Sequence, residues 1–211
     1  MASAASSTAF VPNNNAATAS SRGCALSAVK NNKGFGGFGK VPKIPIPSKP
    51  PKAAKRELQE DRPCPCHSGK TFGECCHGYL AGEALVPSPE HLLRSRYSAF
   101  SLQDADYIVD TTHSTHSDYD GDNREAWKTR VLNGLDELRF VGLDIKAKKS
   151  GSSPDEHHIY FGVDVSVPTP GGGKRAQKST ITEISTFLRE DGRWYYSGGI
   201  VNPTPDVWDE S

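Results

Sequence analysis

Four of the five cysteines in this 211-residue chain lie within thirteen residues, in the segment from Cys64 to Cys76. Their spacing is C-x-C, an eight-residue gap and C-C. Disulfides explain this spacing poorly, because such small loops gain little entropy from a cross-link. A zinc ion explains it well, because zinc holds four thiolates at about 2.3 Å in a closed tetrahedral shell. We therefore predict a structural metal site, with a redox or disulfide role and unpaired thiols as the alternatives.

The predicted metal is zinc, with iron as the alternative. Its predicted ligands are Cys64, Cys66, Cys75 and Cys76. His77 competes with Cys76 for the fourth position, because imidazole is also a zinc ligand. Ser68 and Gly69 supply the turn that folds the second pair of cysteines back onto the first. Four protein ligands leave no open position for a substrate, so the centre is predicted to be structural rather than catalytic.

This segment resembles the SEC-C motif, a small metal knuckle found at the C-terminus of the translocase motor SecA and at the ends of many bacterial proteins. The resemblance implies that the four thiols hold the metal. The motif usually has glycine where this chain has His67. If the backbone needs a positive φ there, histidine tolerates it better than most residues, at the cost of some strain.

The charge of the chain is divided unevenly along its length. The first 56 residues contain nine Lys or Arg and no Asp or Glu, which leaves 16 basic residues against 25 acidic ones in the remainder. An acidic body repels phosphate backbones, whereas non-specific nucleic-acid binding depends on Lys and Arg. We therefore expect neither DNA nor RNA to be the main partner. The sequence contains no run of eighteen apolar residues, so we expect no membrane span.

Residues 1–40 are rich in Ala, Ser, Asn and Gly and contain no acid, which is typical of an organelle transit peptide. A disordered tail is the alternative. Mitochondrial presequences form Arg-rich helices, but Arg22 is the only arginine before Arg56. We therefore predict the chloroplast or plastid stroma, with the mitochondrion as the alternative. Clustered cysteines without a secretory segment also favour a reducing compartment.

We predict four parts of the chain. They are a disordered transit peptide at 1–40, a Pro/Lys-rich linker at 41–60, the zinc knuckle at 61–82 and an α+β domain at 85–205. The linker prediction rests on five prolines interleaved with lysines between residues 42 and 51, a composition that favours extended polyproline II structure.

Three helices are predicted to follow the knuckle. Ser88 is the N-cap of the first, with Pro89 at its first position. The core stripe of this helix, spaced i, i+4 and i+7, consists of Leu93, Tyr97 and Phe100. Asp104 is expected to cap a second helix that ends near Thr111. Asp122 or Asn123 is expected to cap a third helix. The apolar face of the third helix consists of Trp127, Val131, Leu132 and Leu135.

From Leu138 onward the hydrophobic period changes from 3.6 to 2, which predicts strands. The inward residues of the first strand are predicted to be Val141, Leu143 and Ile145. Those of the second are Ile159, Phe161, Val163, Val165 and Val167. A third strand is predicted from about Ala176 to Arg189, and Asp191-Gly192 forms a two-residue hairpin turn into a fourth.

This turn fixes which side chains of the last two strands share a face. The face predicted to lie inside a curved sheet carries Glu183, Ser185, Phe187, Trp194 and Tyr196. The opposite face carries Ile184, Thr186, Leu188 and Tyr195. Glu183 thereby becomes a partly buried carboxylate that needs a partner. The candidate partners are Arg94, Arg96 and Tyr97.

Three helices followed by about four antiparallel strands predict an α+β cone, in which helices close over a curved sheet. Residues 61–200 also resemble the YchJ-like proteins of bacteria and plastids. The resemblance rests on the motifs RSRYSAF at 94–100, ADYI at 105–108, FVGL at 140–143 and EDGRWYY at 190–196, together with the knuckle. It implies a nuclear-transport-factor-2-like (NTF2-like) domain and no particular activity.

Three functions are compatible with the sequence. The first is a non-catalytic adaptor whose knuckle contacts a protein, such as the ribosome or translocation machinery, as the SEC-C resemblance implies. The second is a cone that binds a small molecule or acts as an isomerase or dehydratase. The catalytic candidates would then be Glu183, Asp110, His113, Tyr97 and Tyr196, although none has the spacing of a known catalytic set. The third is metal handling or redox sensing.

Overall fold

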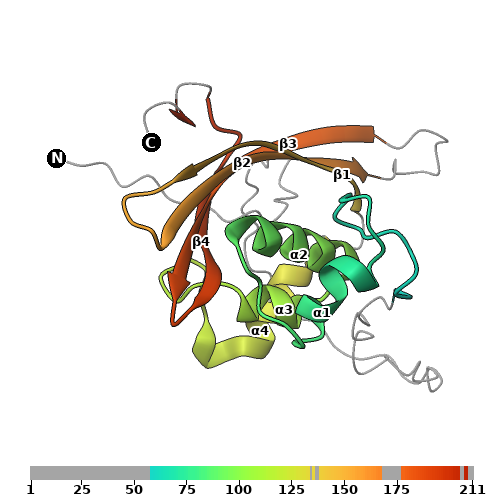
Figure 1. Ribbon diagram of the computed structural model, residues 1–211, viewed down its shortest axis with the longest axis horizontal. Coiled ribbons are helices and arrows are strands. Elements are labelled where there is room, and N and C mark those ends of the chain that lie inside the picture. Colours follow the sequence, from blue (N-terminus) through green and yellow to red (C-terminus); the bar gives the residue numbers. More distant parts are fainter. Residues whose placement is uncertain (1–57, 134, 136–137, 168–176, 205–206, 209–211) are drawn as a thin grey trace, which may run out of the picture. The chain divides into compact units, whose positions relative to one another are not determined.

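A curved, four-stranded antiparallel sheet and a layer of helices against its inner face make up the described part of the protein (Figure 1). The computed structural model describes residues 58–133, 135, 138–167, 177–204 and 207–208. The transit peptide predicted at 1–40 and most of the linker predicted at 41–60 lie outside the described residues. The predicted fold class is confirmed, because helices precede a curved antiparallel sheet and a cysteine cluster precedes the helices.

The three predicted helices are α2 (Pro89–Leu102), α3 (Ala105–Asp110) and α4 (Arg124–Leu132). The Ser88 hydroxyl accepts a hydrogen bond from the His91 amide, and the Asp104 carboxylate accepts one from Tyr107, so both predicted caps are confirmed. Asn123 precedes α4, but its side chain makes no capping bond. A short 3₁₀ turn, η2 (Gly121–Asn123), leads into that helix instead.

The strands are β1 (Arg139–Ser150), β2 (Glu156–Val167), β3 (Gln177–Glu190) and β4 (Arg193–Val201), in the order β1-β2-β3-β4. Arg189 pairs with Trp194 and Phe187 with Tyr196, which confirms the two-residue turn. The predicted inner face is also confirmed, because its five residues are 0–7% exposed. Ala176, the predicted start of β3, lies outside the described residues.

The inward prediction for Val141 in β1 is wrong. The pairing of β1 with β2 shifts between Phe140 and Gly142, which marks a β-bulge, and Val141 is 41% exposed. A bulge inserts one residue and reverses the phase of the alternation on one side of it. Phe140, rather than Val141, therefore packs against the core together with Leu143 and Ile145.

The hydrophobic core continues from the cone into the knuckle. The same cluster of buried side chains contains Cys64, Cys66, Phe72 and Cys76 of the knuckle, Leu92, Leu93 and Tyr97 of α2, and Phe161 and Phe187 of the sheet. The division predicted between 61–82 and 85–205 stays a prediction. Helix α2, which is part of the cone, contacts the knuckle as well as the sheet.

Candidate functional site

Two tight turns position the four cysteines of the knuckle. In the first, the Cys64 amide donates to the Lys70 carbonyl across 2.9 Å, and Gly69 adopts a φ of 82°. The second is a single π-helical turn, η1 (Gly73–His77), in which the His77 amide bonds the Phe72 carbonyl five residues earlier. It leads into the short helix α1 (Gly78–Leu80). The first turn presents Cys64 and Cys66, and the second presents Cys75 and Cys76.

His67 lies in the left-handed region of backbone space, with a φ of 57°. This is the position where the SEC-C motif usually has glycine, so the conformation that favours glycine is retained here with a histidine. The imidazole ring lies edge-on to the ring of Tyr97, with 5.8 Å between the ring centroids. His67 therefore contacts helix α2 and is not part of the cysteine cluster.

The Sγ atoms of Cys64, Cys66, Cys75 and Cys76 all lie within 4.8 Å of one another. Cys66 Sγ is 3.6 Å from Cys75 Sγ, which is 3.8 Å from Cys76 Sγ. Zinc–sulfur bonds of about 2.3 Å in a tetrahedron place the sulfurs about 3.8 Å apart, whereas a disulfide needs about 2.05 Å. All four cysteines are free thiols, so this arrangement fits a tetrahedral metal ion.

The protonation of the cluster also fits a cation. Hydrogen bonds from Cys64 and Cys76 lower the pKa of the Cys66 thiol, while its proximity raises the pKa of Cys64 to about 11. The pKa of Cys76 is raised too, chiefly by the same two neighbours. A divalent cation at the centre of the four sulfurs would stabilise their thiolate forms. Metal binding is supported by this donor set.

His77, the competing fourth ligand, points elsewhere. Its Nε2 atom lies 3.8 Å from the Glu60 carboxylate, and its ring stands edge-on to Phe72 at a centroid distance of 5.4 Å. The assignment of Cys76 as a ligand remains a prediction. The arrangement of the side chains favours it over His77, because the Cys76 thiol lies in the cluster and the imidazole does not.

Two of the polar contacts that hold the knuckle on helix α2 involve its cysteines. Cys64 Sγ lies 3.7 Å from the Ser98 hydroxyl, and both atoms are buried. Arg94 donates a hydrogen bond to the Cys66 carbonyl oxygen across 3.2 Å. Arg94, one of the predicted partners of Glu183, is thus committed to the knuckle and to Glu90.

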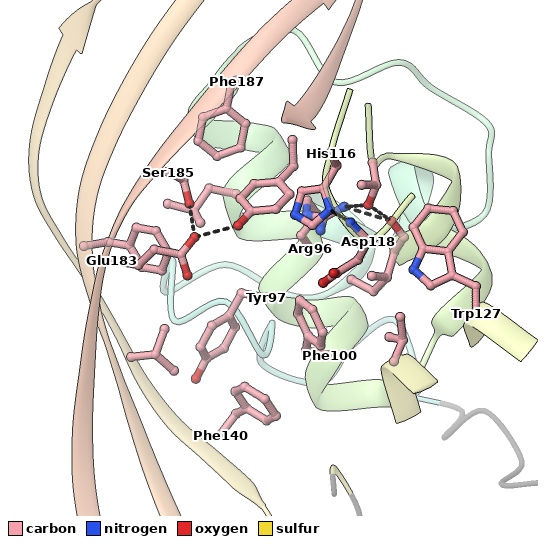
Figure 2. Close-up of a pocket in the computed structure, with 17 residues that line it drawn as sticks. Arg96, Tyr97, Phe100, His116, Asp118, Trp127, Phe140, Glu183, Ser185 and Phe187 are labelled. Carbon is pink, nitrogen blue, oxygen red and sulfur yellow. Dashed lines mark hydrogen bonds between the residues drawn. The ribbon is translucent and has the colours of Figure 1, made fainter. Parts of the chain in front are cut away.

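A second candidate site is a cavity of about 70 Å³ between the helices and the inner face of the sheet (Figure 2). Apolar side chains form most of its wall, among them Leu93, Trp127, Val131, Phe161, Val163 and Phe187. Of the lining residues, only Phe100, Asp118 and Phe140 are not fully buried. These three residues therefore mark the mouth of the cavity.

Glu183 lies in this cavity and is more deeply buried than predicted, at 2% exposed. Its Oε1 atom accepts hydrogen bonds from the Ser185 hydroxyl at 2.6 Å and the Tyr196 hydroxyl at 3.0 Å. Its Oε2 atom has no hydrogen-bond partner among the described residues. Burial raises the pKa of this carboxyl. A Cβ atom at Gly199 would overlap Oε1, so glycine at that position leaves room for the carboxyl group.

Of the predicted partners Arg94, Arg96 and Tyr97, none makes a direct hydrogen bond to Glu183 among the described residues, although the nearby charge of Arg96 acts on its carboxyl group. The Arg96 guanidinium donates instead to three uncharged oxygens, those of Ile108, Thr111 and Thr112, and lies over the Tyr196 ring at 4.6 Å. Burial lowers the pKa of Arg96 to about 10, so it stays a cation at neutral pH. The missed partners, Ser185 and Tyr196, were already on the predicted inner face.

The other catalytic candidates divide between the cavity and the surface. Tyr97 and Tyr196 line the cavity. Asp110 is exposed and pairs with Arg124 at 2.6 Å, and His113 lies 3.5 Å from the Glu190 carboxylate, so neither reaches the cavity. His116, which was not among the candidates, is 6% exposed and lines the cavity, with its ring 5.3 Å from that of Tyr196.

Comparison with known proteins agrees with this arrangement. Residues 88–199 match the family described as YchJ, middle NTF2-like domain. A SEC-C motif containing protein from Rhodopseudomonas palustris is 32% identical, over 65% of this chain and 96% of that one, with a TM-score of 0.49. Another from Psychrobacter arcticus is 26% identical, over 69% of this chain and 85% of that one, with a TM-score of 0.50. None of the described helices is long and apolar enough to cross a membrane.

Proposed function

Because the chain belongs to the family described as YchJ, middle NTF2-like domain, and carries a SEC-C-like knuckle, we propose that it is a zinc-binding, non-catalytic adaptor of the plastid. The observation that carries this proposal is the cluster of four thiols at the spacing of a tetrahedral ion. Four protein ligands complete the coordination of zinc and leave no site for a substrate. The metal therefore has a structural role, and the biological contacts fall to the surface that it holds in shape.

The partner-binding surface of the proposed adaptor is the outward side of the knuckle. Its buried side packs on helix α2, whereas Arg62, His67, Lys70 and Glu74 are exposed. Both signs of charge are present in this group, which suits a polar protein surface. The proposed partner is a protein, and the ribosome or the translocation machinery are the candidates that the SEC-C resemblance offers.

Metal analysis tests the first part of the proposal. Protein purified under reducing conditions should contain about one zinc ion per chain, and Cys64→Ser should lose it. Protein that is metal-free, with four freely titratable thiols and a melting temperature unchanged by a chelator, would contradict it. Iron, or zinc that exchanges freely with a chelator, would indicate metal handling or redox sensing instead.

Cosedimentation and import assays test the partner and the compartment. Purified plastid ribosomes should retain the protein, and Lys70→Glu should weaken retention while the zinc content stays constant. Lys178→Glu, an exposed charge reversal on β3, is the matched control. Residues 1–60 fused to a reporter should direct it into isolated chloroplasts. Import into mitochondria alone would refute the plastid assignment.

The cavity supports a second candidate function, the binding of a small molecule inside the cone. It is favoured by Glu183, a lining residue whose buried Oε2 atom has no hydrogen-bond partner among the residues that the structure describes. Leaving such an atom unpaired costs about 1–3 kcal/mol, which a bound ligand would recover. An isomerase or dehydratase would use Glu183 as its acid or base, because Asp110 and His113 lie outside the cavity.

A further inference from the structure

The buried polar groups of the cavity define which kind of ligand it accepts. His116 provides the first constraint. Its Nδ1 atom lies 3.0 Å from the Asp118 backbone amide, which can only donate. Nδ1 is therefore the acceptor, which assigns the proton of the neutral ring to Nε2. This Nε2 atom is buried and has no hydrogen-bond partner within the part of the chain that the structure describes, so His116 offers the cavity a donor. Burial lowers the pKa of His116 and so favours the neutral ring.

Glu183 provides the second constraint. The Ser185 and Tyr196 hydroxyls both donate to Oε1, which suits the carbonyl oxygen of a neutral carboxylic acid. Oε2 is then the hydroxyl of the acid, and it too is buried without a hydrogen-bond partner in the described region. The raised pKa of this carboxyl supports the same protonation state. Glu183 therefore offers a second donor.

Charge and size provide the third constraint. The Arg96 cation lies in the wall of the cavity, where Tyr196 connects it to Glu183, whereas the Asp118 carboxylate lies at the mouth (Figure 2). A negative group at the entrance disfavours anions, while a buried cation strengthens donors to a dipolar oxygen. At about 70 Å³, the cavity is about half the size of one that encloses benzene. It therefore takes a head group, and the body of the ligand lies against Phe100 and Phe140, whose rings stack on each other with 6.3 Å between their centroids.

From these observations we infer that the cone binds a neutral carbonyl compound with a flat apolar body, whose oxygen accepts hydrogen bonds from His116 Nε2 and Glu183 Oε2. This inference rests on the second proposed function, ligand binding in the cone. It assigns His116 and Glu183 as the residues that bind the head group. The apolar body lies against the two phenylalanines at the mouth.

The test is an NMR titration of the zinc-loaded full chain with four probes of matched size. Acetophenone carries a carbonyl group, and benzoate carries a carboxylate. Benzylamine carries a hydrogen-bond donor, and ethylbenzene has no polar head group. We expect acetophenone to bind more tightly than the other three and to shift the His116 ring resonances. Glu183→Gln keeps a donor at the Oε2 position and should change the acetophenone affinity by less than about threefold.

Glu183→Leu and His116→Phe each remove one hydrogen-bond donor. Each should weaken acetophenone binding by about tenfold. Glu125→Gln, at an exposed position on α4, is the control and should have no effect. Tighter binding of benzylamine, with its loss in Glu183→Gln, would overturn the donor assignment and leave the cone as a ligand site. Tighter binding of benzoate would overturn the choice of a neutral carbonyl. If no probe binds the folded protein, the inference and the second proposed function both fail.

Discussion

The Arg94 guanidinium donates a hydrogen bond to the Cys66 carbonyl oxygen across 3.2 Å, and this bond ties the metal centre to the cone. The two residues are 28 positions apart in the chain. Glu90, one turn earlier on α2, accepts from Arg94 Nε at 2.9 Å and so holds the guanidinium in place. The knuckle is thereby fixed to helix α2 through its own backbone, close to two of the predicted ligands.

Arg94→Met removes this bond but keeps the apolar stem of the side chain. We expect the free energy of unfolding to fall by about 1–2 kcal/mol, because a hydrogen bond from a charged donor is lost. We also expect the metal to pass faster to a competing chelator. Chemical denaturation and chelator competition measure the two effects. Arg130→Met, at an exposed position on α4, is the control, and equal rates of metal transfer in both variants would contradict the prediction.

Metal removal should destabilise the whole described region, because Cys64, Cys66 and Cys76 belong to the same hydrophobic cluster as Leu92 and Leu93. Structural zinc contributes about 10–16 kcal/mol of binding free energy in small domains. We expect calorimetry after chelation to show a single transition at a much lower temperature. Two transitions, with the upper one unchanged from the loaded protein, would show that the cone folds independently of the knuckle.

Trp194→Ala should lower the free energy of unfolding by about 3–5 kcal/mol, as expected for the deletion of a large core side chain. Trp194 is 7% exposed, and its ring packs edge-on against His157 at 5.3 Å. Ile200→Ala, 48% exposed on the neighbouring part of β4, should cost less than about 1 kcal/mol. Urea denaturation of both variants measures the two losses in the free energy of unfolding. Losses of similar size would contradict the prediction.

The stability of the protein should depend on pH through Glu183. Burial raises its pKa, so the folded chain keeps a proton that the unfolded chain releases near its usual value of about 4.3. This contribution to stability is complete below the unfolded value and is lost as the pH rises through the folded value. We expect the wild type to lose stability relative to Glu183→Gln as the pH rises above about 4.3, until the folded carboxyl group has also released its proton.

Denaturation curves measured at a series of pH values test this expectation. His116, with its lowered pKa, titrates in both proteins and largely cancels in the comparison. The cysteine cluster is also common to both. A constant difference between the wild type and Glu183→Gln would mean that the carboxyl group is not shifted by burial.

Features set by local sequence were predicted correctly. The Ser88 and Asp104 caps need only the first turn of their own helices, and the Asp191-Gly192 turn fixes the register of the β3–β4 hairpin. Val141 was misplaced because an alternating pattern does not reveal where a bulge reverses its phase.

Features set by packing between distant elements could not be predicted. His116 lies in a segment without periodicity, and its burial depends on Tyr196, eighty residues later. The partners of Glu183 could have been found, because Ser185 and Tyr196 were on the same predicted face of the hairpin. The contact between Arg94 and Cys66 leaves no signal in the sequence of either segment.

Helix α2 lies between the knuckle and the cavity. Its Arg94 and Ser98 side chains contact the knuckle. Its Arg96, Tyr97 and Phe100 side chains line the cavity. Consecutive residues of an α-helix are about 100° apart around its axis, so the two sets cannot move independently. A rotation that repacks the cysteines also turns the cavity-lining side chains. A redesign of the cavity for a new ligand should therefore keep the metal in place. Replacing the knuckle with a different metal-binding segment would also change the cavity.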